Sequence, residues 1–423
     1  MKKVLLIGYP FPYRHGGSPR LVGLAKYLPE FGWEPDILTP PLDEKPGPEL
    51  KIIETGYSRP LWEKILKISP GEDARKRMKQ RLGDKSKKSV LDFFFTHAGE
   101  ILNYPDYDKG WKRFAVKQGS DLLSAGEFSA IISSSAPVTA HLIARELKIK
   151  FKKPWIADLR DLWTQNHNYS YSAVRKFFDR RLEIKTLSAA DALVTVSEPW
   201  ASKLGELHRN KPVFTVTNGF DPETVNNPPA PLTSKFTITY TGLIYPGQQD
   251  TGKLFAALSE LVSKGDVEAG KIEVRFYGSA EEWLDKEAEK FGLANMVKQY
   301  GQVPRDTAIQ KQRESQLLLL LDWDDPREKG TYPGKVFEYL AAGRPILATG
   351  GFKENVVAAL LRETKAGIQA VDTVEIIGAL LDFYGEFKRN GRLAPRGDEN
   401  IIKNYSQSGM AKKFADVLGK LGQ

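Results

Sequence analysis

The stretch that decides the fold is residues 316–349, which read QLLLLLDWDDPREKGTYPGKVFEYLAAGRPILAT. The apolar run 317–321 has the length of a buried strand and is far too short to span a membrane. A turn at Pro333 and Gly334 precedes a short helix pattern over 335–342, which Gly343 ends. Residues 346–349 then predict a second strand. The order strand, loop, helix, strand indicates an α/β unit with a parallel sheet.

The start of the helix predicted over 335–342 is a candidate anion site. Backbone N–H groups of Gly334, Lys335 and Val336 can point at a phosphate there, and the helix dipole adds to the attraction. Lys335 supplies a positive charge. One turn later, the Glu338 carboxylate can accept two hydrogen bonds from a vicinal diol such as a ribose. The alternative is that Glu338 only complements the helix dipole.

The segment 333–348, PGKVFEYLAAGRPILA, closely resembles the donor-binding segment of GT-B glycosyltransferases, in particular the large retaining group often called family four. The resemblance implies that Glu338 binds the nucleotide ribose and that Gly334 and Lys335 face the diphosphate. It also implies an α/β protein with the GT-B fold, in which two Rossmann-like parallel-sheet domains face each other across a cleft. The C-terminal helix, 406–421, is then expected to cross back to the first domain.

Three positions depart from the family pattern. Gly330 stands where the family commonly has a Glu that contacts the sugar. Leu243 and Gln248 stand where an Arg and a Lys often bind the diphosphate. Charge neutralisation at the diphosphate must then come from helix N-termini or from other cations. The candidates are Lys335, Arg327, Lys329 and Arg14, with Lys253 as a weaker one.

Length and composition fit a soluble globular protein of two or three domains. The chain has 423 residues, of which 41% are hydrophobic and 27% charged. The absence of Cys excludes disulfides, thiolate metal sites and a Cys nucleophile. The first residues predict a buried strand of a cytoplasmic protein and not a signal peptide. We expect an acceptor-side domain at 1–218, joined by about 405–423, and a donor domain at 219–404.

The positive charge is concentrated in the first half of the chain. Residues 1–218 carry 36 Lys and Arg against 25 Asp and Glu, and the basic residues are densest over 75–88. Such a run can meet anionic lipid, nucleic acid or acidic glycan, or can simply be a solvated helical face. After the solvated face, the next interpretation is peripheral contact with an anionic membrane on its inner face, because apolar residues at 62–68 lie just upstream and could insert. The chain has no nucleic-acid recognition motif.

Two loops of the first domain follow predicted strands, where open α/β sheets bind ligands. The loop after the first strand contains Arg14, His15, Gly16 and Gly17. The resemblance implies that this loop faces the donor phosphates and the acceptor. Arg14 can neutralise an anionic group there, and the alternative is an ordinary tight turn with surface charges.

The second loop, DLRDLW over 158–163, follows the strand predicted at 154–157 and resembles a motif in a branch of these transferases. Asp158 and Asp161 are the candidates for binding or activating the acceptor hydroxyl, with Arg160 as a contact to phosphate or acceptor. The alternative is a buried Arg–Asp pair that pins the loop. Together with Lys335, the two carboxylates form the predicted catalytic set.

The remaining candidates lie on loops of the second domain. Gly242 and Gly278 end predicted strands, Val303 belongs to the segment that packs on the nucleotide base in the family, and Tyr332 precedes the Pro333 turn. Asp322-Trp-Asp324 is the nearest look-alike of an Asp-x-Asp metal motif, but the fold usually needs no metal and we predict none.

The sequence therefore predicts a glycosyltransferase of the hexosyltransferase class. It would move a sugar from a UDP-sugar or GDP-sugar to a glycan or lipid-linked acceptor hydroxyl, with retention implied by the resemblance alone. Two alternatives stay open: a nucleotide-sugar 2-epimerase on the same fold, and a non-catalytic sugar-nucleotide binder. The three departures from the family pattern motivate the second alternative.

Overall fold

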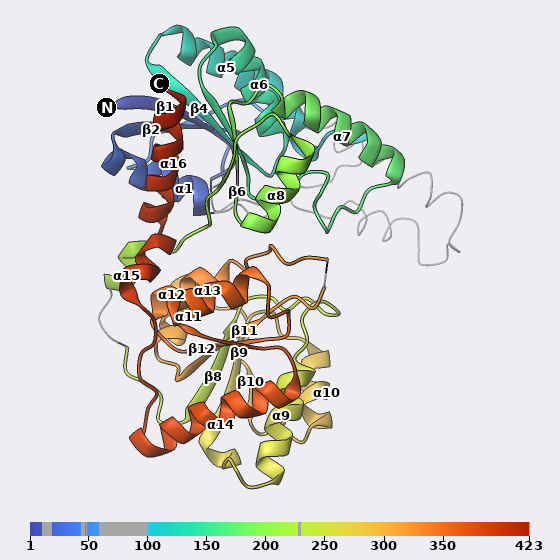
Figure 1. Ribbon diagram of the computed structural model, residues 1–423, viewed down its shortest axis with the longest axis vertical. Helices are drawn as coiled ribbons and strands as arrows, with labels where there is room; N and C mark the ends of the chain where they lie inside the picture. The colour runs from blue at the N-terminus through green and yellow to red at the C-terminus, as the bar shows by residue number, and fades with distance from the viewer. Residues whose placement is uncertain are drawn as a thin grey trace. The chain divides into compact units, whose positions relative to one another are not determined.

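The structure is a computed structural model that describes residues 1–10, 19–43, 47, 49–58, 100, 102–226, 230–325 and 327–422. The loop with Arg14, His15, Gly16 and Gly17 and the segment that holds 62–68 and 75–88 lie outside the described residues. The chain divides into two compact units (Figure 1). Unit 1 comprises Met1–Thr217 and Met410–Gln423, and unit 2 comprises Asn218–Gly409.

Unit 1 is built on a seven-stranded sheet in the order β3-β2-β1-β4-β5-β6-β7, and all neighbouring strands pair in parallel. The central strands β1 and β4 are buried along most of their length because helices cover both faces of the sheet. The strands are β1 (Lys2–Ile7), β2 (Trp33–Thr39), β3 (Ile52–Glu54), β4 (Phe128–Ser135), β5 (Trp155–Leu159), β6 (Ala192–Thr195) and β7 (Val213–Thr215).

The helices of unit 1 form a layer on each face of this sheet. They are α1 (Pro19–Tyr27), α5 (Lys112–Ser124), α6 (Thr139–Phe151), α7 (Ala173–Leu187), α8 (Glu198–Leu207) and α16 (Gln407–Leu421). Leu21 and Leu24 of α1 and Phe414 of α16 share one core with Val4 and Leu6 of β1. Helices α5 and α6 contribute to the core on the other face. The prediction that the last helix returns to the first domain is confirmed.

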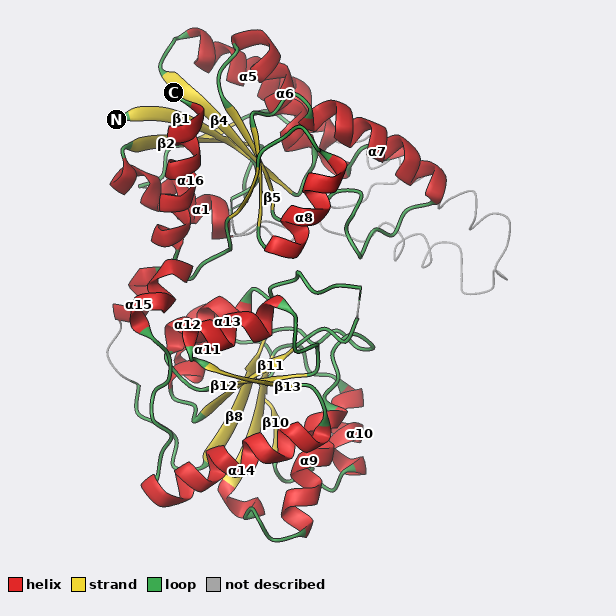
Figure 2. Cartoon of the chain, in the orientation of Figure 1, coloured by secondary structure: helices red, strands yellow, loops and turns green. Residues whose placement is uncertain are grey.

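Unit 2 has a six-stranded parallel sheet in the order β10-β9-β8-β11-β12-β13 (Figure 2). Its strands are β8 (Phe236–Thr241), β9 (Ile272–Tyr277), β10 (Val297–Gln299), β11 (Leu317–Leu321), β12 (Ile346–Thr349) and β13 (Gly367–Ala370). Its helices are α9 (Gly252–Ser263), α10 (Glu282–Lys290), α11 (Arg305–Arg313), α12 (Lys335–Ala342), α13 (Val356–Thr364), α14 (Thr373–Asn390) and α15 (Glu399–Ile402). Helices α9 and α14 join one core, and α12 and α13 join the other.

Short 3₁₀ helices complete the described elements: η1 (Leu28–Phe31), η2 (Tyr107–Trp111), η3 (Pro222–Asn226), η4 (Ala269–Lys271) and η5 (Lys403–Tyr405). The stretch 316–349 forms β11, α12 and β12 as predicted, and Gly343 ends α12 in the left-handed region with φ of +65°. In the described part of the chain, no helix combines the length and the apolar character that crossing a membrane requires.

Candidate nucleotide-binding site

The strand order of unit 2 reverses direction between β8 and β11, which are hydrogen-bonded neighbours. In open parallel sheets, ligands bind outside the carboxyl ends of the strands at such a switch point. The loop after β8 begins at Gly242, and the chain after β11 leads to α12, which carries Lys335 and Glu338 on its first turn. The fold therefore brings the decisive residues of the sequence to the expected edge of the sheet.

Close backbone contact explains the two glycines at this edge. The N–H of Gly242 donates to the carbonyl oxygen of Tyr277 at 2.7 Å. A Cβ on Gly278 would collide with the carbonyl oxygen of Gly242, which itself has φ of +113°. A Cβ on Gly242 would lie 3.1 Å from Nζ of Lys335. The structure thus gathers three of the predicted donor-binding residues, Gly242, Gly278 and Lys335.

The Lys335 ammonium lies against Tyr240. Its Nζ donates to the Tyr240 hydroxyl and lies 3.9 Å from the centroid of the ring. Burial lowers the pKa of Lys335 to about 7, although the Glu338 carboxylate nearby opposes the shift. An ammonium whose charge is poorly solvated gains more from an anion than a surface lysine does. The Lys335 ammonium can therefore attract a negatively charged group at this edge of the sheet.

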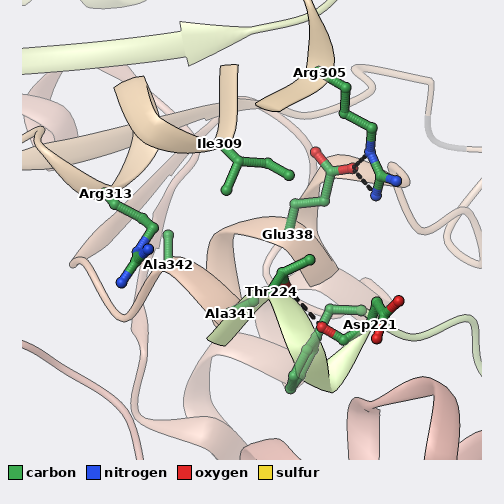
Figure 3. A pocket seen from close by; sticks show the side chains of 9 residues that line it. Asp221, Thr224, Arg305, Ile309, Arg313, Glu338, Ala341 and Ala342 are labelled. Atoms are coloured by element: carbon green, nitrogen blue, oxygen red, sulfur yellow. Dashed lines mark hydrogen bonds and ion pairs between the residues drawn. The ribbon is translucent and has the colours of Figure 1, made fainter. Parts of the chain in front are cut away.

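Glu338 is held by helix α11. Its Oε1 accepts from Arg305 Nη2 at 3.0 Å and Nε at 3.3 Å, and its Oε2 accepts from Gln312 Nε2 at 3.4 Å. Gln312 Nε2 also donates to Thr241 Oγ1 at 2.9 Å, at the end of β8. The carboxylate and Arg305 face a small pocket that residues of η3, α11 and α12 line (Figure 3). Besides its place on the first turn of α12, Glu338 therefore has an ion-pair partner and a hydrogen-bond partner on a second helix.

One predicted donor at the start of α12 is already used. The N–H of Val336 donates to the carbonyl oxygen of Pro333 at 2.9 Å, because the helix begins with a tight turn. The prediction that this N–H group faces a phosphate is therefore wrong.

Two further predicted residues of unit 2 lie apart from each other. Tyr332 packs its ring against Phe337, with ring centroids 5.6 Å apart. Val303 lines a different, open pocket with Tyr277 and Tyr300.

The other predicted cations of unit 2 differ in their surroundings. Arg327 pairs with Asp325 at 2.6 Å, and Lys253 pairs with Asp324 at 3.0 Å. The side chain of Lys329 is exposed. Lys253, the weaker candidate of the sequence, is therefore already neutralised by a carboxylate.

The Asp322-Trp-Asp324 segment uses its carboxylates inside the protein. Asp322 is buried and accepts hydrogen bonds from Asn355 at 2.6 Å and Gln369 at 2.9 Å, and burial raises its pKa to about 6. Asp324 accepts from Lys253 and from the N–H of Gly351. Among the described residues, no cluster of three or more His, Cys, Asp or Glu side chains has the arrangement of a metal site.

Gly330 and Leu243 also have defined environments. The N–H of Gly330 donates to the carboxylate of Glu328 at 2.8 Å, and Gly330 itself is buried. Leu243 is 49% exposed. The loop after β8 therefore presents an apolar side chain to solvent where the resembled family often presents an Arg.

In unit 1, Asp158 is fully buried at the end of β5. Its oxygens accept from Arg20 Nε and Nη2, each at 2.9 Å, and from Ser134 Oγ at 2.7 Å. The prediction that Asp158 contacts the acceptor is wrong, because its carboxylate is enclosed by the protein. The alternative of a buried Arg–Asp pair holds, but the partner is Arg20 of α1 and not Arg160.

Of the other residues of the DLRD segment, Leu159 is buried, Arg160 is half-buried and Asp161 lies at the surface of unit 1. Arg160 donates to the carbonyl oxygens of Ser135 at 2.7 Å and Ala136 at 2.9 Å. Asp161 is exposed. Of the two carboxylates predicted to act on the acceptor, Asp161 is the one that a ligand can reach.

No protein-family model and no curated protein matches the chain. Solved structures do match. HepE from Anabaena in complex with UDP is 12% identical, with a TM-score of 0.61 over 99% of this chain and 100% of that one. Sucrose-phosphate synthase from Thermosynechococcus elongatus is 12% identical, with a TM-score of 0.57 over 100% and 99%. The lipopolysaccharide outer core galactosyltransferase WaaB is 13% identical, with a TM-score of 0.55 over 99% of both chains.

The chain has the GT-B fold. The matches cover both parallel-sheet units of this GT-B protein, including the helix α16 that returns to unit 1. The predicted fold class is thereby confirmed.

Two side chains that contact Glu338, Arg305 and Gln312, are not among the residues that the sequence indicates. Both lie on α11, one helical face of which packs against α12. The sequence does contain one signal, since Arg305 directly follows Val303-Pro304, in the segment that packs on the nucleotide base in the resembled family. The direction in which α11 points its side chains depends on tertiary packing, which local pattern does not report.

Proposed function

We propose that this GT-B protein is a glycosyltransferase that takes a hexose from a nucleotide-diphosphate sugar, UDP-linked or GDP-linked. The observation that carries the proposal is the placement of Glu338 and Lys335 on the first turn of α12, at the switch point of the unit 2 sheet. The solved structures of HepE with UDP and with UDP-glucose support a donor of this class.

In the proposed complex, the ribose diol donates to the Glu338 carboxylate, and the diphosphate lies against the N–H groups of Gly334 and Lys335. Cleavage of the bond between the sugar and the diphosphate leaves negative charge on the leaving group. The helix N-terminus and the Lys335 ammonium stabilise that charge, which is the main catalytic task in this reaction. Lys335 takes up a proton as the anion binds, since burial keeps much of it neutral near pH 7.

The acceptor in this proposal is a hydroxyl of a glycan or of a lipid-linked sugar. Asp161 is the carboxylate proposed to contact that hydroxyl, and retention at the anomeric carbon is proposed from the family resemblance. The excess of positive charge in the first half of the chain supports work at the cytoplasmic face of an anionic membrane.

The test is calorimetric titration of UDP, GDP, ADP and their sugars into the wild-type protein, the Glu338→Ala variant and the Glu282→Ala variant. Glu282 is a matched control, since it is an exposed Glu at the start of another unit 2 helix, α10. Selective binding of one nucleotide that is lost only in Glu338→Ala supports the proposal. Binding that is indifferent to Glu338, or no binding at all, overturns it.

A second candidate function is a non-catalytic sugar-nucleotide binder. The exposed Leu243 and the buried Gly330 favour it, because neither supplies the polar contact to diphosphate or sugar that the resembled family often has. Incubation with the donor and a panel of glycan acceptors distinguishes the two. Tight donor binding without turnover supports the binder, whereas a glycosylated product supports the transferase.

A further inference from the structure

Helix α7 of unit 1 turns its acidic side chains inward. Asp179 is 1% exposed and accepts hydrogen bonds from Arg175 Nε at 2.8 Å and from the Tyr169 hydroxyl at 2.6 Å. Glu183 is fully buried and accepts from the N–H and the hydroxyl of Thr164. Both negative charges of the helix are therefore enclosed in unit 1.

The opposite face of α7 is apolar and basic, and we call it the α7 face. Its apolar members are large and exposed: Val174 at 69%, Phe177 and Phe178 at 53% each, and Ile184 at 42%. Its basic members are all exposed: Lys176, Arg180, Arg181 and Lys185. The Arg181 guanidinium lies 4.4 Å from the centroid of the Phe177 ring. Figure 1 shows α7 in green, extending along the border of unit 1.

Exposing two phenyl rings and two aliphatic side chains to water on one helical face is unfavourable in free energy. A face that combines them with four cations and no anion matches the layered chemistry of a lipid surface. There, the apolar side chains enter the boundary of the acyl chains, and the cations reach anionic headgroups. Asp179 and Glu183 point into unit 1, so their negative charges, which an anionic surface would repel, are absent from the α7 face.

We propose that the α7 face docks this protein on an anionic lipid surface. The occupant is the membrane itself, and the charge complementarity of the face argues for it over a second copy of the same chain, whose α7 face is equally basic. The proposal concerns α7 alone and does not include the basic run 75–88. It is independent of the donor site in unit 2, so the two can fail separately.

The test is sedimentation of the full chain with vesicles of phosphatidylcholine alone and of phosphatidylcholine mixed with phosphatidylglycerol. We compare the wild type with Phe177→Ser/Phe178→Ser and with Arg180→Glu/Arg181→Glu. Matched controls alter exposed residues of unit 2: Val374→Ser/Leu381→Ser on α14 and Lys286→Glu/Lys290→Glu on α10. A basic residue near an anionic surface contributes about fivefold in affinity, so the double charge reversal should lower partitioning by roughly 30-fold or more.

The expected result is binding to the mixed vesicles that weakens with salt, falls in both α7 variants and persists in both controls. Three results overturn the proposal: equal binding to neutral vesicles, unchanged binding of the α7 variants, or loss only when the run 75–88 is neutralised. A change from dimer to monomer in Phe177→Ser/Phe178→Ser, with unchanged vesicle binding, also overturns it and assigns the face to a second copy. Nucleotide titration of each variant checks the fold and separates this result from the proposed transferase activity.

Discussion

Two arginine–carboxylate pairs of nearly equal length lie in opposite surroundings in the two units. In unit 1, Arg20 and Asp158 are 2.9 Å apart and neither side chain is exposed. In unit 2, Arg305 and Glu338 are 3.0 Å apart, and their side chains are 47% and 31% exposed. Two ion pairs of nearly the same length can therefore differ in role. An enclosed pair stabilises the fold, whereas in an exposed pair a ligand can replace one of the two partners.

The buried pair is saturated by the protein. Arg20 donates to Asp158 and to the carbonyl oxygens of Val216 and Thr217, each at 2.9 Å. Its guanidinium also lies 5.0 Å from the Phe414 ring centroid. The exposed pair has no such enclosure. A diol that replaces Arg305 on Glu338 breaks a contact worth about 0–1 kcal/mol, because solvent screens it.

The largest expected effect comes from breaking the buried pair. Arg20→Leu leaves Asp158 charged and enclosed, so the free energy of unfolding of unit 1 should fall by about 3–5 kcal/mol. Urea denaturation followed by far-UV circular dichroism measures it, with Arg145→Leu as a control at a half-buried site on α6. The double variant Arg20→Leu/Asp158→Leu should recover much of the loss, since no unpaired charge remains. A double variant as unstable as the single one would assign the effect to packing and not to charge.

The exposed pair should respond in the opposite way. Glu338→Gln keeps the shape of the side chain but removes its charge, so nucleotide affinity should fall by about 10–100-fold, as for hydrogen bonds to a charged group. The unfolding free energy should change by at most about 1 kcal/mol. Calorimetry and urea denaturation of the same variant measure both quantities. A loss of stability as large as that of Arg20→Leu would erase the distinction between the two pairs.

Lys335 adds a pH dependence to the exposed site. The lowered pKa of about 7 means that the free protein loses the Lys335 proton above pH 7, whereas a bound diphosphate favours the charged form. Binding should therefore take up a proton, and nucleotide affinity should fall above pH 7 by up to about tenfold per pH unit. Titrations at pH 7, 8 and 9 in buffers of different ionisation enthalpy measure the uptake. The same uptake in Lys335→Met would assign the proton to another group.

The smallest effect is expected at Arg305. Arg305→Ala leaves Glu338 its contact with Gln312, so stability should change by less than about 1 kcal/mol and nucleotide affinity by less than about fivefold. The measurements are those used for Glu338→Gln. An affinity loss as large as that of Glu338→Gln would show that Arg305 itself contacts the nucleotide.

The same contrast explains what the sequence could predict. The stretch 316–349 was predictable because strand length, the Pro333-Gly334 turn and the Gly343 cap are local signals. Glu338 followed from its place one turn into a helix and from the family resemblance. The partner of Asp158 could not be predicted from the sequence. Arg20 is 138 residues away in the chain, and only the packing of α1 against the sheet brings it near.

Some elements were missed for physical reasons of their own. Strand β13 is the four-residue segment Gly367–Ala370, in which Ile368 is exposed and Gln369 half-buried, so the sequence shows no apolar run. Strand β3, Ile52–Glu54, is shorter still. Helix α13 follows the Gly350-Gly351 turn, and Asn355 caps it through the N–H of Ala358. The Asn355 cap is a local signal, so the start of this helix is the part of the missed structure that the sequence does indicate.

Helix α16 has a consequence for how the chain is made. Arg20 contacts Met410 across 390 residues, and Phe414 fills the same core as β1. Unit 1 therefore lacks one covering helix until residues 410–421 have been synthesised, whereas all the described strands of unit 2 precede that point in the chain. We expect the apolar surface that α16 covers to stay accessible to chaperones until then. A nascent chain that stops before residue 410 should leave unit 1 incompletely folded.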